Sequence, residues 1–295
     1  MSVQLLEKKT EANLKTLDAV SHALVLMPKG KTLADVPGKP ALAALLKRKD
    51  MKAEELAKTP LALETGAGLR VYAMLDVAAD TYSRHAQLRQ ALAPLLNEHP
   101  AELQLALYGA DAFKQTAASD AVYCAAVNAQ PLPTQKSGKL PGALQRLTVH
   151  GVTARGGHAR ELAVAEGNTL TRALTSLPPN QLTPGAYRKR IARLAKDYGW
   201  RLEEFGFDKL KKMGAGAFCA VAQGSPAKDA AIVHLTYKGQ VAKGKGRKIA
   251  LVGKGICFDT GGHNLKPAKY MHGMHEDMNG SAVVLGILAA ASRLK

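Results

Sequence analysis

The sequence predicts an α/β protein in which a small N-terminal α/β domain precedes a second α/β domain. Its 295 residues are enough for two domains with separate cores. A hydrophobic fraction of 46% beside a charged fraction of 22% is typical of a globular protein. Short apolar runs alternate with amphipathic helical patterns, as they do around a largely parallel sheet. We therefore expect domains at residues 1–150 and 151–295.

Elements of the first domain follow from apolar periodicity. Three short apolar runs bounded by turn residues predict buried strands. These runs are residues 23–27, 69–75 and 102–108. Residues 40–49 and 84–97 have the spacing of amphipathic helices. Three prolines and two glycines predict a loop at residues 129–142, and residues 144–149 resemble one more strand.

The second domain opens with an alanine- and leucine-rich helix at residues 160–175, which ends before the prolines of residues 177–180. Thr183 and Pro184 predict the start of another helix that reaches about Tyr198. Four further runs predict strands, at residues 201–205, 217–221, 230–237 and 248–252. A last apolar helix is expected from about Asp277 to the end of the chain.

Composition indicates a cytosolic protein without a membrane partner. No apolar run is long enough to cross a membrane, and residues 1–20 carry acids and lysines instead of the apolar core of a signal peptide. The three cysteines, Cys124, Cys219 and Cys257, show neither a disulfide framework nor a CxxC metal spacing. This usage is typical of a reducing compartment.

The net charge of +17 lies mostly in the second half, where 23 Lys and Arg face 10 Asp and Glu in residues 151–295. Clustered basic residues can bind nucleic acid. A lysine-rich solvated face, as in residues 238–248, is a second interpretation. The third is that acidic partners belong to a further C-terminal portion. We favour a combination of the second and third interpretations over nucleic-acid binding.

The candidate metal-binding and catalytic side chains of the sequence lie in residues 249–282. The predicted strand ends at Gly253-Lys254-Gly255, and Asp259, Lys266 and Asp277 follow. A phosphate loop is excluded because Gly255 stands where Ser or Thr is needed. Two carboxylates near a strand end and a helix start could instead bind divalent ions. Taken singly, however, an aspartate after a strand can be a turn former, and a lysine can be a solvated charge.

Three ordered motifs resemble the leucine aminopeptidase family. They are NTLTRALTSLPPNQLTP at residues 168–184, GAGAFCAVAQGS at residues 214–225, and VGKGICFDTGG with the later NLKP and MHEDMNGSAVVLG. The resemblance covers about residues 160–292, whereas residues 1–150 match only in architecture. It implies a small N-terminal α/β domain followed by a metallo-aminopeptidase catalytic domain, of which this sequence contains an incomplete part.

The resemblance also implies residue roles. Asp259 matches the carboxylate that bridges two ions (Zn or Mn), while Lys254 and Asp277 match further ligands of one ion. A lysine ligand binds as the neutral amine, which only a nearby dication would stabilise. Lys266 matches the catalytic lysine that stabilises the oxyanion, and Met274 matches a residue of the pocket for the first side chain. The implied reaction is attack of a metal-activated water on the first peptide bond, releasing N-terminal amino acids such as leucine.

The sequence departs from the family at a later motif, Asn-Thr-Asp-Ala-Glu-Gly-Arg, which is absent from the 295 residues. Two ions would then be under-ligated, so we expect this chain alone to be nearly inactive and to hold at most one ion weakly. His272 and His275 form an H-x-x-H that could add ligands or be solvated histidines. His263 is interpreted as a variable position, and Cys257 as a small buried hydrophobe.

Partners and alternatives follow from these expectations. Peptides are the expected substrates, and the family assembles as hexamers, which the incomplete domain puts in doubt. The alternatives are a truncated, non-catalytic binding module and a nucleic-acid-binding protein.

Overall fold

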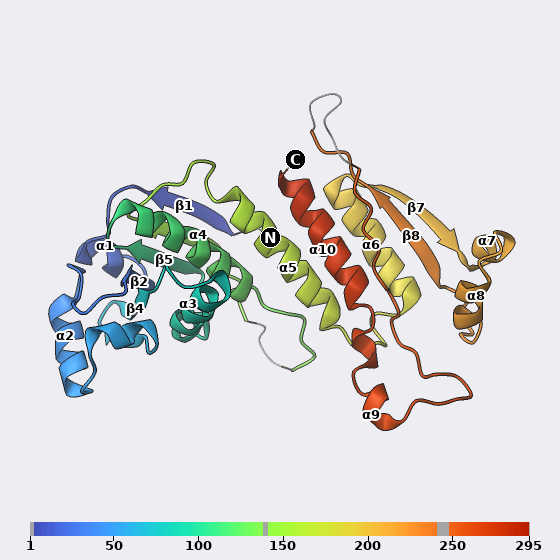
Figure 1. Cartoon of the computed structure of the whole chain (residues 1–295), viewed down its shortest axis with the longest axis horizontal. Helices are drawn as coiled ribbons and strands as arrows, with labels where there is room; N and C mark the ends of the chain where they lie inside the picture. The colour runs from blue at the N-terminus through green and yellow to red at the C-terminus, as the bar shows by residue number, and fades with distance from the viewer. Residues whose placement is uncertain (1–2, 138–140, 241–247, 295) are drawn as a thin grey trace. The chain divides into compact units, whose positions relative to one another are not determined.

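The computed structural model describes residues 3–137, 141–240 and 248–294 (Figure 1). Contacts divide the chain into unit 1, Met1–Pro131 with Gln135–Glu166, and unit 2, Leu132–Thr134 with Gly167–Lys295. The helix α5 (Ala159–Thr175) contributes residues to both units. The α/β class is confirmed, while a domain boundary after residue 150 stays a prediction.

Unit 1 is built on a six-stranded sheet with the order β1-β6-β5-β2-β4-β3. All strand pairs are parallel except β3 with β4. The strands are β1 (Gln4–Lys8), β2 (His22–Pro28), β3 (Leu61–Thr65), β4 (Gly68–Leu75), β5 (Glu102–Leu107) and β6 (Arg146–His150). The four strands expected from apolar runs in this region are confirmed as β2, β4, β5 and β6.

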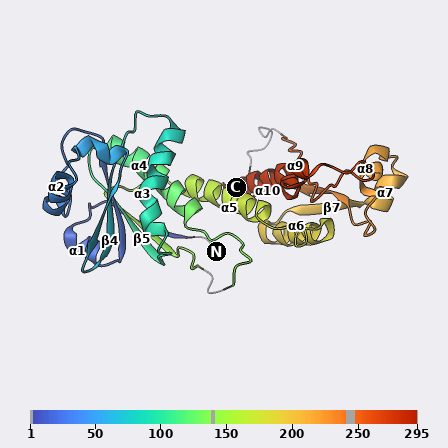
Figure 2. The ribbon, with the colours of Figure 1, turned by 90° about the horizontal axis from the view of Figure 1, so that it is seen from below.

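Helices cover both faces of this sheet (Figure 2). One face packs against α1 (Leu14–Asp18), α2 (Lys39–Arg48) and the short helix η1 (Ala53–Ala57). The other packs against α3 (Thr81–Leu96) and α4 (Asp111–Asn128). The expected helices at residues 40–49 and 84–97 are confirmed as α2 and α3. The sequence did not reveal α4, because its buried residues, many of them alanines, cover most of the helix circumference and leave no narrow apolar stripe.

Three helices form the centre of unit 2, namely the end of α5, α6 (Pro184–Tyr198) and α10 (Asn279–Leu294). Their expected positions are confirmed, including the start of α6 at Thr183, whose side chain accepts a hydrogen bond from the amide of Ala186. In the part of the chain that the structure describes, no helix has the length and apolar character needed to cross a membrane.

Glycines let α5 and α10 approach closely. A Cβ on Gly167 would lie 2.4 Å from the carbonyl oxygen of Gly286, and one on Gly286 would lie 2.3 Å from Oγ1 of Thr171. The Thr171 hydroxyl donates to the carbonyl of Ala282 at 3.1 Å. The helix that follows the candidate site is therefore held tightly to the unit 2 core.

The remaining elements of unit 2 are short. Strands β7 (Arg201–Gly206) and β8 (Ala231–Thr236) form an antiparallel pair, in agreement with two of the expected strands. The short helices are α7 (Phe207–Lys212), α8 (Gly216–Ala222), α9 (Ala268–Met271) and η2 (Met274–Glu276).

Two strand predictions in unit 2 are wrong. Residues 217–221 lie in α8, because a short run rich in alanine does not distinguish helix from strand by its periodicity. Residues 248–252 form no strand and are all exposed. A strand needs a hydrogen-bonded neighbour, and the sequence pattern alone does not show whether one is present.

Candidate metal centre

Close packing fixes Lys254 beside the start of α10. A Cβ on Gly253 would lie 2.6 Å from the carbonyl oxygen of Gly280 and 2.6 Å from the Cα atom of Ser281, so only glycine fits there. The amide of Ser281 donates to the Lys254 carbonyl at 2.8 Å. The Ser281 hydroxyl is in turn 2.9 Å from the hydroxyl of the buried Tyr187. The contact between Tyr187 and Ser281 was not predicted from the sequence, because the two residues lie far apart in it.

The predicted ligands Lys254 and Asp277 lie together. The Nζ atom of Lys254 is 2.8 Å from Oδ2 of Asp277, in an ion pair whose lysine side chain is largely exposed. Asp277 immediately follows η2 and donates its amide to the Met274 carbonyl at 3.3 Å. Such an exposed ion pair contributes little to the free energy of unfolding. Its relevance is that it places a positive and a negative charge side by side at the candidate site.

The predicted catalytic residue Lys266 lies against Asp259 and Met274. Its Nζ atom donates to the Asp259 carbonyl at 2.8 Å and is 3.2 Å from Oδ2 of the same residue. It is also 3.5 Å from the sulfur of Met274. The structure thus brings together two groups, Lys254 with Asp277 and Lys266 with Asp259 and Met274.

Local hydrogen bonds favour the charged form of Asp259. The amide of Gly261 donates to Oδ1 at 2.9 Å, and the backbone turn is closed by the Lys266 amide on the Thr260 carbonyl at 2.9 Å. The Gly261 amide first, and then the Lys266 and Lys254 ammonium groups, hold the pKa of Asp259 below its ordinary value. The Asp259 carboxylate is therefore ionised at neutral pH and available to a cation.

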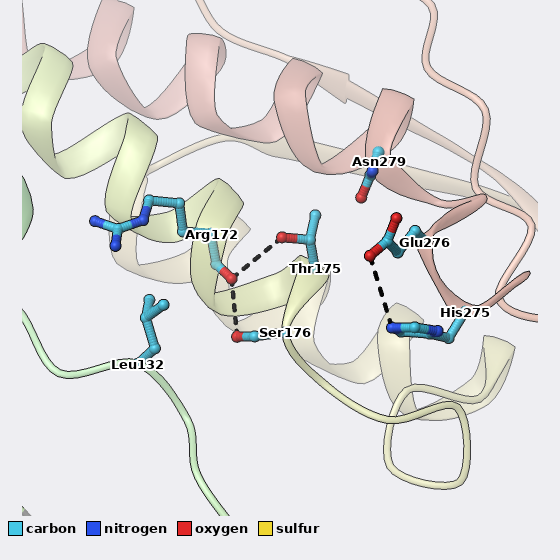
Figure 3. Close-up of a pocket in the computed structure, with 7 residues that line it drawn as sticks. All are labelled: Leu132, Arg172, Thr175, Ser176, His275, Glu276 and Asn279. Carbon is cyan, nitrogen blue, oxygen red and sulfur yellow. Dashed lines mark hydrogen bonds and ion pairs between the residues drawn. The ribbon is translucent and has the colours of Figure 1, made fainter. Parts of the chain in front are cut away.

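His275 and Glu276 lie apart from these groups. In a 3₁₀ turn side chains three residues apart share a face, so Met274 and Asp277 lie on one side of η2. His275 and Glu276 instead line a shallow hollow of about 360 Å³ (Figure 3). Its other lining residues are Leu132, Arg172, Thr175, Ser176 and Asn279. The Nε2 atom of His275 is 3.9 Å from Glu276 Oε1, and nothing joins the imidazole to the predicted ligands.

The donor set fits a divalent ion only in part. Two carboxylates and one amine are ligands that Zn²⁺ or Mn²⁺ accepts. Each carboxylate is paired with a lysine ammonium, which shows that the position attracts positive charge. Within residues 3–137, 141–240 and 248–294, no three His, Cys, Asp or Glu side chains converge in a way that could hold a metal. The residues present therefore fit an incomplete metal site.

Comparison with known proteins agrees with this fold and this segment. The sequence profile of the catalytic domain of the cytosol aminopeptidase family matches residues 169–295. A probable cytosol aminopeptidase from Acidovorax sp. is 34% identical over 303 residues, covering 96% of this chain and 58% of that protein. One from Hydrogenovibrio crunogenus is 44% identical over 135 residues, covering 45% of this chain and 26% of that protein.

Solved structures show the same fold. A mutant of tomato leucine aminopeptidase has a TM-score of 0.74 at 20% identity, covering 99% of this chain and 60% of that one. The bottromycin maturation enzyme BotP in complex with Mn has a TM-score of 0.69 at 24% identity, covering 93% of this chain and 56% of that one.

These findings indicate similarity to a family of aminopeptidases. Residues 169–295 match the catalytic domain of the cytosol aminopeptidase family, in agreement with the motifs around Lys254 and Asp277. The chain spans less than two thirds of the length of the relatives that it matches.

Proposed function

We propose that the protein is a metal-dependent aminopeptidase and that residues 254–277 supply part of its metal site. The carrying observation is the pair of lysine–aspartate contacts, 2.8 Å for Lys254–Asp277 and 3.2 Å for Lys266–Asp259, at the positions of the family motif. The family profile over residues 169–295 and the Mn complex of a solved protein of similar fold support this proposal.

Lys254, Asp259 and Asp277 would hold the ion. A bound divalent ion supplies a water of lowered pKa and polarises the carbonyl group of the substrate. To become a ligand, the Lys254 amine must release a proton and leave its ion pair with Asp277, so metal binding would release protons. In the complete site we propose two ions, Zn or Mn, of which the residues described here would hold at most one, weakly.

Lys266 would act on the substrate directly. Its ammonium group can donate a hydrogen bond to the oxygen of the scissile carbonyl and stabilise the negative charge that develops there. Met274, whose sulfur is 3.5 Å from that ammonium group, would contact the first side chain of the peptide. The proposed substrates are peptides with an N-terminal residue such as leucine, and the proposed location is the cytosol, after which the relatives are named.

Hydrolysis of leucine p-nitroanilide by the 295-residue chain, with Mn²⁺ or Zn²⁺ and with a chelator control, tests the activity. Calorimetric titration with Mn²⁺ tests the site separately. We expect one weak binding event that Asp259→Asn abolishes and that the control Asp208→Asn, an exposed aspartate on α7, leaves unchanged. Little or no hydrolysis is expected, because three donors leave two ions under-ligated.

Two results would change this proposal. Turnover that disappears in Lys266→Ala would support the aminopeptidase activity but would contradict the expected inactivity of this chain, because other residues would then complete the metal site. Absence of Mn²⁺ binding in the folded chain would remove the metal site and leave a non-catalytic binding module as the better description.

Nucleic-acid binding remains a second candidate because of the charge distribution. Helix α6 carries Arg188, Lys189, Arg190, Arg193 and Lys196 within fifteen residues. Contacts to phosphate would make the affinity for duplex DNA fall steeply with salt. Binding without a steep salt dependence would not support this candidate. The hexamer expected from the family also stays a prediction.

A further inference from the structure

Ser281, in the first turn of α10, contacts the backbone on both sides of the pair formed by Lys254 and Asp277. Its amide donates to the Lys254 carbonyl at 2.8 Å, and its hydroxyl donates to the Met278 carbonyl at 2.7 Å. Met278 directly follows Asp277 and is buried. One serine therefore connects the two chain segments whose side chains meet at 2.8 Å in the candidate metal centre.

Tyr187, on the neighbouring helix α6 (Figure 1), completes this arrangement. Its hydroxyl lies 2.9 Å from Oγ of Ser281, and its ring packs in the same buried cluster as Met278. A serine hydroxyl has one proton, which here is directed at the Met278 carbonyl, so Tyr187 donates and Ser281 accepts. Burial raises the pKa of Tyr187 to about 12, so its hydroxyl keeps this proton at neutral pH.

The glycines on either side of Lys254 lie directly against Ser281. A Cβ on Gly253 would lie 2.6 Å from the Cα atom of Ser281, and one on Gly255 would lie 3.3 Å from its hydroxyl oxygen. A displacement of Ser281 would therefore be transmitted to the backbone of Lys254. Because the Lys254 side chain is long and largely exposed, its backbone is where the fold can restrict its position relative to Asp277.

We propose that Tyr187 and Ser281 are positioning residues of the metal centre, which hold Lys254 and Asp277 at the separation that an ion requires. Ligands of a metal site need to be placed within about 0.5 Å, and groups that do not touch the ion commonly fix them. This inference rests on the proposed function, because it concerns the residues that would hold the ion. It deepens that function by assigning a role to two residues outside the predicted ligand set.

Tyr187→Phe removes the donated hydrogen bond and keeps the ring. Tyr237→Phe is the matched control, because the Tyr237 hydroxyl donates to the Ser292 carbonyl at 3.3 Å, near the opposite end of α10. Hydrogen exchange followed by NMR, with a chelator present, reports the opening of single amides. Since a hydrogen bond contributes about 1 kcal/mol, Tyr187→Phe should accelerate exchange of the Ser281 amide about fivefold. Tyr237→Phe should not accelerate it.

Titration with Mn²⁺ gives a second measurement, which a purely structural role would not change. Tyr187→Phe should weaken the affinity for Mn²⁺ about fivefold, and Tyr237→Phe should leave it unchanged, although each variant loses one hydrogen bond to α10. Ser281→Ala leaves the Tyr187 hydroxyl buried without its acceptor. This variant should therefore bind Mn²⁺ more weakly than the double variant Tyr187→Phe/Ser281→Ala, in which neither hydroxyl remains.

Trp200 fluorescence verifies that each variant is folded, since this residue packs in the unit 2 core. An unchanged exchange rate of the Ser281 amide in Tyr187→Phe, or equal acceleration by Tyr187→Phe and Tyr237→Phe, would overturn the inference. So would an Mn²⁺ affinity that Tyr187→Phe does not alter. If the wild-type chain bound no Mn²⁺, the proposed function would fail instead, and the exchange rates alone would decide whether Tyr187 and Ser281 hold Lys254.

Discussion

Two apolar runs of similar composition differ in burial and in strand pairing: one is a central strand of unit 1, and the other is exposed in unit 2. In unit 1, β2 lies between β4 and β5 and exposes 1% or less of its residues Leu24, Val25 and Leu26. In unit 2, Ile249 and Val252 are 80% and 96% exposed in a segment without strand pairing. Strand propensity is therefore expressed only where neighbouring strands and covering helices exist.

The difference concerns energy as well as geometry. Burying an aliphatic side chain contributes about 1.5 to 3 kcal/mol, and β2 places its side chains in cores on both faces of the sheet. The run at residues 248–252 contributes almost nothing of this kind while it stays exposed. Unit 1 should thus depend on its apolar run for folding, whereas unit 2 should not.

Replacement of Leu26 by alanine should give the largest effect. Its side chain is 1% exposed in the core between the sheet and the helices α3 and α4. The lost contacts and the resulting cavity should lower the free energy of unfolding by about 2 to 5 kcal/mol. The matched change Val252→Ala should stay within about 0.5 kcal/mol of the wild type. Urea unfolding followed by circular dichroism measures both, and a comparable loss in Val252→Ala would show that the exposed run is packed.

This contrast also explains how much of the fold the sequence predicts. Strands β2, β4 and β5 were recognised because each is buried over nearly its whole length and therefore appears in the sequence as a continuous apolar run. Helix α4 was missed because its buried residues include many alanines and cover most of the helix circumference. The run at residues 248–252 was predicted as a strand because periodicity reports propensity and not the presence of a neighbour.

The candidate site divides in the same way. Lys254, Asp259, Lys266, Met274 and Asp277 were found through their resemblance to a family motif. A local turn joins Lys266 to Asp259, whereas packing against the start of α10 brings Lys254 to Asp277. The supporting contact between Tyr187 and Ser281 joins residues far apart in the sequence, so no local pattern could reveal it. The hollow beside Glu276 was missed for the same reason, since its lining comes from three separate segments.

Adding one methyl group at the contact between α5 and α10, by the substitution Gly286→Ala, should destabilise unit 2. In Gly286→Ala the added Cβ would lie 2.3 Å from Oγ1 of Thr171 and 2.5 Å from the Gly167 carbonyl oxygen. We expect a loss of about 1 to 3 kcal/mol, although alanine alone favours a helix over glycine. Trp200 reports the change, because its indole N–H donates to Ser292 of α10 at 2.7 Å.

Gly224→Ala is the matched control, since nothing lies within 4 Å of the Cβ atom that it adds. This variant should unfold at nearly the same urea concentration as the wild type. If Gly286→Ala matched it, the crossing of α5 and α10 would be looser than the contacts show, and unit 2 would lack the tight core that positions Asp277.

The smallest effect is expected for an ion pair of unit 1 that resembles the pair in the candidate site. Lys29 follows β2, Asp76 follows β4, and their charged atoms are 2.9 Å apart at the ends of two paired strands. The Lys29 side chain first, together with the amides of Ala78 and Ala79, holds the pKa of Asp76 below its ordinary value. A lowered pKa in the folded state means that the pair stabilises the protein above the unfolded pKa of about 3.9.

This contribution should disappear as the pH falls through the lowered pKa of Asp76. Asp76→Asn should therefore reduce the free energy of unfolding at pH 7 by less than about 1 kcal/mol, because both partners are partly solvated. The difference from wild type should shrink when urea unfolding is repeated at about pH 3, where the unfolded carboxyl group is mostly protonated. Asp35→Asn, at a fully exposed side chain, is the control for loss of one negative charge. If the difference in free energy of unfolding between Asp76→Asn and the wild type were the same at both pH values, the charge of Asp76 would not contribute to stability. The resemblance between this pair and the lysine–aspartate pairs of the candidate site would then be limited to their geometry.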